Sequence, residues 1–241
     1  MINIKSSTLL KWCSSLFIII CIGHILAVIS TFGLDNIDHN KSLLKTMFYF
    51  GYEKNITALF SAGLFILLGC YFRTIALHNT PNQKHWHLIS YIAVFLACDE
   101  WFAIHDAVLN IYGRGLFNIP IWVWVYGSLA LILLITSIKF LKNIPSFLMK
   151  YLILSGFIYI SGSAIMEVVT YSYINTNSIL ENIGWFFEDG LEMAGTLTMI
   201  IGATIWLKNQ KTTMLSFKKW PTIIIIAISF SDLILSFVLY K

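Results

Sequence analysis

Seven apolar runs, each about as long as a bilayer is thick, dominate this chain of 241 residues. A transmembrane helix needs about twenty predominantly apolar residues. Only 12% of the residues are charged, against about 25% in a typical globular domain. That composition excludes a soluble enzyme, and it excludes a disordered chain because disordered chains are rich in charge and poor in aromatic residues. We therefore expect one polytopic membrane domain over residues 1–241.

The runs define the expected helices by position. They cover residues 9–32, 56–77, 87–112, 119–140, 147–171, 183–207 and 221–240. Proline or glycine occurs in several of the connections between them, as is usual where helices end. The expected fold class is all-α, with seven transmembrane helices.

Lysine and arginine are distributed unevenly over the two sides of such a bundle. If the chain starts in the cytoplasm, eleven of its 16 basic residues lie on the cytoplasmic side and five on the other. Because basic residues concentrate in cytoplasmic loops, we expect a cytoplasmic N-terminus and an extracytoplasmic C-terminus. Lysines facing anionic membrane lipid also account for the net charge of +4 without a nucleic-acid partner.

The acidic residues show the opposite distribution. Eight of the twelve lie inside the expected spans: Asp99, Glu100, Asp106, Glu167, Glu188, Asp189, Glu192 and Asp232. An acid at a helix centre costs about 2.5–3.5 kcal/mol on insertion scales. At a rise of about 1.5 Å per residue, these acids all fall in the middle or outer half of the bilayer. The pattern predicts one polar site at that depth.

Carboxylates with imidazole and no basic side chain at the same depth need a positive charge, which a divalent cation or protons can supply. We expect a divalent metal (iron, manganese, zinc or calcium), with the ligands His105, Asp106, Glu167, Glu188 and Glu192. Asp99 or Glu100 would accept a proton. Glu100 and His105 diverge from Asp99 on an ideal helix, so both reach one site only if that helix is enclosed or locally unwound. His24, alone on an apolar helix, is more typical of a hydrogen-bonded core histidine.

Two strings of residues carry a resemblance. Asp99-Glu100-x-x-x-x-His105-Asp106 and Glu188-Asp189-x-x-Glu192-Met193 resemble motifs of uncharacterised bacterial multi-pass membrane proteins. In those proteins Asp-Glu precedes His-Glu, and Glu-Glu precedes Glu-Met. Here Asp106 and Asp189 keep the charge but shorten its reach. The resemblance implies a bacterial cytoplasmic (inner) membrane and supplies no reaction.

Three functions remain open from the sequence. The first is a membrane-embedded, metal-dependent enzyme that acts from the outer side on a lipid or other lipophilic substrate. The second is a transporter or channel for cations or protons that uses the same acids. The third is a sensor or assembly factor stabilised by a metal. Membrane lipids are the expected surroundings in each case.

Overall fold

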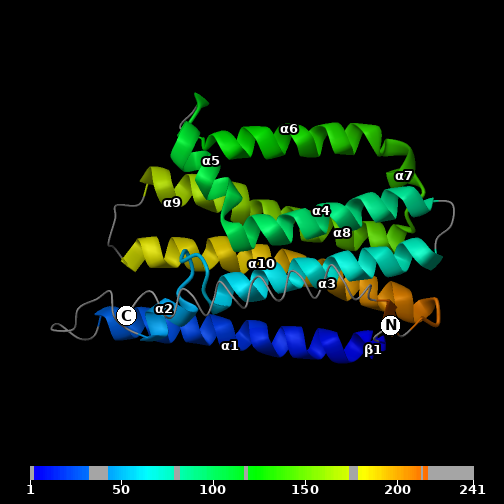
Figure 1. Cartoon of the computed structure of the whole chain (residues 1–241), viewed down its shortest axis with the longest axis horizontal. Coiled ribbons are helices and arrows are strands. Elements are labelled where there is room, and N and C mark those ends of the chain that lie inside the picture. The colour runs from blue at the N-terminus through cyan, green and yellow to red at the C-terminus, as the bar shows by residue number, and fades with distance from the viewer. Residues whose placement is uncertain are drawn as a thin grey trace.

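The computed structural model describes residues 3–32, 43–78, 82–116, 119–173, 179–212 and 214–216. These residues form a stack of long helices that run in nearly the same or opposite directions (Figure 1). The helices are α1 (Ser6–Phe32), α2 (Leu43–Phe48), α3 (Ile56–His78), α4 (Gln83–Phe102), α5 (Ile104–Tyr112), α6 (Ile121–Thr136), α7 (Ile138–Lys142), α8 (Ser146–Ile160), the π-helical turn η3 (Ser161–Met166), α9 (Glu167–Tyr173) and α10 (Ile179–Asn209). Two short strands, β1 (Asn3–Lys5) and β2 (Met214–Ser216), pair antiparallel at one end.

The helical architecture expected from the sequence is confirmed in the described residues, apart from the short β1–β2 pair. Four helical segments are long and apolar enough to cross a bilayer: Ser6–Ser30, Ile56–His78, Ser146–Thr170 and Ile179–Asn209. The third and fourth expected spans are each divided, into α4 with α5 and into α6 with α7. The seventh expected span, with Asp232, lies outside the described residues.

Helix α10 lies at the centre of the packing. It contacts α1, α3, α8 and η3, while α3 packs along α4. Small residues allow the close approach of α10 to α8, since a Cβ atom at Gly195 would lie 2.8 Å from the backbone nitrogen of Tyr159. Small residues at such contacts are typical of helix packing in membranes. Helix α6 differs from the others, because its close backbone contacts are with α5 and α7 at its two ends.

A left-handed residue divides the third expected span. Ala103 has φ 50° and ψ 48°, and its N–H donates to the backbone oxygen of Asp99. This conformation ends α4, and α5 starts at the next residue in a different direction. Of the two alternatives expected from the sequence, an enclosed or a locally unwound helix, the local unwinding is therefore present between Asp99 and His105.

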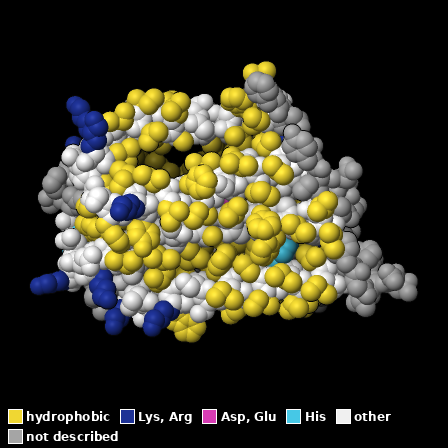
Figure 2. Space-filling model, turned by 180° about the vertical axis from the view of Figure 1, so that it is seen from behind, with side chains coloured by type: hydrophobic (Ala, Val, Ile, Leu, Met, Phe, Trp, Pro, Cys, Tyr) yellow, Lys and Arg dark blue, Asp and Glu magenta, His cyan; other side chains and the backbone are white. Residues whose placement is uncertain are grey.

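The surface matches a protein that faces lipid. Large apolar side chains are exposed along most helices. Figure 2 shows them covering one face, with the visible lysine and arginine side chains gathered at one end. The same view shows a hollow beneath the uppermost helix, α6.

Candidate functional site

A cavity of about 740 Å³ lies between α4, α6 and the α8–η3–α9 helix, and it extends to the start of α10. Its wall along α6 is apolar. At its other end the cavity is lined by every candidate residue that the sequence predicted: Asp99, Glu100, His105, Asp106, Glu167, Glu188 and Glu192. Asp189 and Glu53 line it as well. The single polar site expected from residue depth is therefore formed by residues from five segments of the chain.

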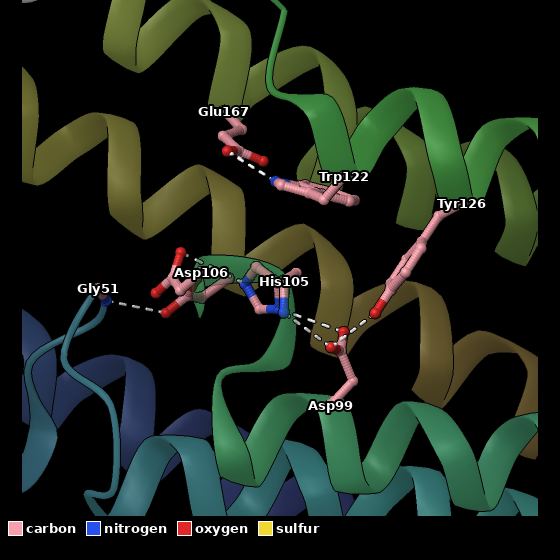
Figure 3. Close-up of polar contacts among 8 residues, drawn as sticks. Gly51, Asp99, His105, Asp106, Trp122, Tyr126 and Glu167 are labelled. Carbon is pink, nitrogen blue, oxygen red and sulfur yellow. Dashed lines mark hydrogen bonds and ion pairs between the residues drawn. The ribbon is translucent and has the colours of Figure 1, made fainter. Parts of the chain in front are cut away.

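The break at Ala103 folds His105 back onto Asp99. The backbone N–H of His105 donates to Asp99 Oδ1 at 3.0 Å, and His105 Nδ1 lies 3.1 Å from Asp99 Oδ2. The Tyr126 hydroxyl of α6 donates to Asp99 Oδ1 at 2.9 Å. Figure 3 shows these side chains pointing toward one another. Asp99 is buried, and it fixes the orientation of the imidazole ring.

The other ring nitrogen of His105 faces a group of carboxylates. Nε2 lies 3.8 Å from Asp106 Oδ1. Ligand atoms of Glu53, His105 and Asp106 all lie within 4.8 Å of one another, which is close enough to hold one metal ion. A histidine that gives one nitrogen to a metal and the other to a carboxylate is a common arrangement in metal sites. The donor set fits a divalent cation that accepts oxygen and nitrogen ligands.

The remaining predicted ligands line the cavity outside this group of three. Glu167 is buried at the start of α9, and its Oε1 accepts a hydrogen bond of 3.1 Å from Trp122 Nε1 (Figure 3). The π-helical turn before it packs tightly on α10, since a Cβ atom at Gly162 would lie 2.5 Å from the Glu188 backbone oxygen. Glu188 has a buried Oε2 atom without a hydrogen-bond partner among the described residues. Met193, next to Glu192, is packed in the core.

Glu53 is the site residue that the sequence did not indicate. It lies in the connection between α2 and α3, outside any apolar run and beside Lys54. Long-range contacts bring this connection onto α10. The Gly51 N–H donates to Asp189 Oδ2 at 3.0 Å, and the Tyr49 hydroxyl donates to Asn182 Oδ1. Asp189, to which the sequence assigned no role, therefore holds the segment that carries Glu53.

The surroundings of Glu53 favour its protonated form. Although Glu53 is exposed, its carboxyl group lies within 4.8 Å of ligand atoms of His105 and Asp106. Desolvation, with repulsion from Glu100 and Asp106, raises the pKa of Glu53 to about 8. A carboxyl group with such a pKa accepts a cation only by giving up a proton.

His24 does not line the cavity. It is buried, accepts a hydrogen bond at Nδ1 from the Phe50 N–H at 3.0 Å, and packs against the rings of Phe50 and Phe186. The prediction that His24 is a core histidine is confirmed. His24 also holds the connection after α2 in place, because its partner Phe50 directly precedes Gly51, which binds Asp189.

The fold and the cavity define an all-helical protein of the membrane type with an acid-rich internal site. Residues 16–207 match a domain of unknown function, DUF8692. Because this match covers more than half of the sequence, the chain belongs to that family. No curated protein and no solved structure matches the chain significantly.

Proposed function

We propose that this protein is a membrane-embedded, metal-dependent enzyme that acts on a lipid or other lipophilic substrate. The observation that carries the proposal is the cavity of about 740 Å³, which joins an apolar wall to a carboxylate–histidine end. Such a shape accommodates a substrate with an apolar body and a reacting polar group. Ligand sites of this size are usually apolar with a few convergent polar groups.

In this proposal the chain crosses the membrane seven times, with a cytoplasmic N-terminus and an extracytoplasmic C-terminus. Four helices of sufficient length and hydropathy support it, as do the divided spans α4–α5 and α6–α7. The lysine and arginine side chains that gather at one end mark the cytoplasmic side of a bacterial inner membrane. The acid-rich end of the cavity then lies in the outer half of the bilayer.

The metal would be held by Glu53, His105 and Asp106. A divalent cation there would act as a Lewis acid on a substrate oxygen or on water. Asp99 orients His105 through the bond to Nδ1. Glu100 is the proton acceptor in this assignment, because Asp99 already accepts hydrogen bonds from His105 and Tyr126. Glu167, Glu188 and Glu192 surround the reacting groups, and they could provide further ligands after a rearrangement of side chains.

Transport of cations or protons is the second candidate, and the row of carboxylates favours it. The carboxyl groups extend from Glu53 at the mouth to Asp99 and Glu192 inside the helices. However, the sequence contains no aspartate or glutamate in residues 54–98, 107–166 or 193–231. A relay toward the basic end of the molecule would therefore have no acidic group to continue it, so we rank the enzyme first.

The test uses purified protein in nanodiscs made from a total bacterial lipid extract. Wild type and His105→Ala are incubated with and without added divalent metal, and the lipids are compared by mass spectrometry. His87→Ala is the matched control, since His87 belongs to the same expected span but lies in the first turns of α4. We expect one lipid class to be consumed by wild type and by His87→Ala, and only with metal.

Two results would contradict the enzyme. One is an unchanged lipid profile with every metal tested. The other is metal-dependent turnover that His105→Ala retains. Cation or proton flux into liposomes, measured with the same three proteins, would then place transport first.

A further inference from the structure

Helix α6 covers the cavity, and it contacts the helices across the cavity through Trp122 and Tyr126 near its start. Among its described residues only Trp122, near the start, is buried. Its close backbone contacts are with α5 and α7 at its ends. Figure 1 shows α6 running above the other helices, and Figure 2 shows the hollow beneath it.

The face of α6 that lines the cavity is mostly apolar, and beyond the aromatic rings of Trp122 and Tyr126 it includes two small residues. Gly127 and Ala130 line the middle of the cavity, and a Cβ atom at Gly127 would meet nothing within 4 Å. Leu133 lines it farther along, so the lining extends eleven residues from Trp122, about 16 Å of helix. The opposite wall presents Ile92 from α4 and Ile160 from α8.

The cavity opens sideways to the region that a bilayer would fill. Four of its large apolar lining residues are exposed by 48% or more: Phe95 on α4 at 48%, Leu129 and Ile132 on α6 at 54% and 56%, and Ile160 on α8 at 57%. Protein interiors are close-packed, because the side chains around a void lose the dispersion contacts that neighbours would provide. An apolar chain from the surrounding lipid can supply those contacts, since it can slide in between α4 and α6.

The polar end of the cavity selects the head group. Eight carboxyl groups and one histidine line it, and none of the described lining residues is a lysine or arginine. Arg114 is close enough to act on the charge of Glu167, but it is not part of the lining. The aromatic side chains of Trp122 and Tyr126 donate hydrogen bonds to Glu167 and Asp99. Carboxylates attract a cation, and aromatic faces favour an ammonium group.

We propose that this chamber binds a long-chain amphiphile with an ammonium head group, which reaches it from the bilayer between α4 and α6. The alkyl chain lies beneath α6 and the head group lies among the acids. The inference deepens the proposed function by naming a substrate class. Binding of the amphiphile does not depend on the proposed enzyme activity, whereas its role as a substrate rests on that activity. A phosphate head group would meet eight acids without a basic partner in the lining.

The test is photo-crosslinking in phosphatidylcholine nanodiscs. The probes share one alkyl chain with a diazirine at its end, and they carry a trimethylammonium, hydroxyl or sulfate head. We expect the trimethylammonium probe to label the walls near Ile92 and Leu133, with an apparent affinity at least about tenfold higher than that of the sulfate probe. Equal labelling by all three probes would overturn the choice of head group.

Two matched glycine variants test the location. Gly127→Phe places a large side chain at the lining of the chamber, whereas Gly156→Phe makes the same change on α8 away from the lining. Neither Cβ position has a neighbour within 4 Å. We expect labelling to be lost in the first variant and kept in the second. Ala130→Phe, one turn farther along α6, provides a second plug should Gly127→Phe fail to fold. Equal labelling in all folded variants would overturn the chamber.

Repeating the labelling after chelation separates this inference from the proposed function. Labelling that persists in a protein that takes up no metal when metal is added back, as measured by elemental analysis, supports the chamber and contradicts the metal enzyme. A protein that keeps its metal and its dependence on His105, but shows no chamber labelling, supports the enzyme and overturns the ammonium-lipid inference.

Discussion

At the scale of single residues, Asp99 acts on the site through His105. It accepts the His105 backbone N–H and also lies 3.1 Å from Nδ1, so it fixes both the ring orientation and the tautomer. We expect Asp99→Asn to weaken metal binding about 10- to 100-fold, as is typical when such a partner is lost. Competition with a chromophoric chelator measures the affinity.

The control for this change is Tyr126→Phe. It removes one hydrogen bond to Asp99 and leaves the contact with His105 in place. We expect a clearly smaller loss of metal affinity than in Asp99→Asn. Equal losses in the two variants would show that Asp99 does not act by orienting His105.

Gly51 determines whether Glu53 reaches the site. Its φ of +77° favours glycine, and a Cβ atom there would lie 2.8 Å from the Trp185 ring. Gly51→Ala should therefore shift the connection, weaken the bond to Asp189 and lower the metal content. Gly113→Ala is the matched control, because Gly113 has a φ of +68° but no atom within 4 Å of a Cβ. Both should lose about 1–3 kcal/mol from backbone strain, and only Gly51→Ala should lose metal in elemental analysis. Equal metal content in the two variants would show that Glu53 is not a metal ligand.

Among the helices, the left-handed turn between α4 and α5 forms the site but lowers the stability of the folded protein. An alanine in this conformation costs about 1–2 kcal/mol relative to a helical one. Ala103→Gly should relieve part of this strain and raise the melting temperature while metal binding persists. Ala107→Gly, within α5, should lower it, because glycine in a helix interior costs about 0.5–1 kcal/mol. Thermal melts of both variants check the signs. A fall in both variants would show that Ala103 is not strained.

The sequence predicted where the helices lie because apolar run length is a local property. Thus α1, α3, α8 and α10 occupy expected spans, and the acids at 99–106 and 188–192 line one cavity. The sequence indicated that the third span is enclosed or locally unwound, but it did not show that the break lies at Ala103, because no glycine or proline occurs there. Glu53 was missed because its place depends on contacts of Gly51 and Tyr49 with α10, more than 130 residues away. Hydropathy and periodicity carry no information on such contacts.

At the scale of the whole molecule, the proposed orientation places the α5–α6 turn outside and the α7–α8 turn in the cytoplasm. Single cysteines at Arg114 and Asn143 test it, in a chain whose four native cysteines have been replaced. A membrane-impermeant thiol reagent added to intact cells should label position 114 and not position 143. The reverse pattern would invert the chain and move the acid-rich end of the cavity to the cytoplasmic half.

In the proposed function, Glu53, His105 and Asp106 hold one divalent metal at the end of an apolar chamber. Anomalous X-ray diffraction from crystals of the metal-loaded protein tests it most directly, with data collected on both sides of the absorption edge. We predict one strong peak about 2.0–2.6 Å from ligand atoms of these three residues. Such a peak should be absent from crystals of His105→Ala grown in the same metal. A wild-type map without a peak among these residues, or with the metal bound elsewhere, would contradict the proposed metal site.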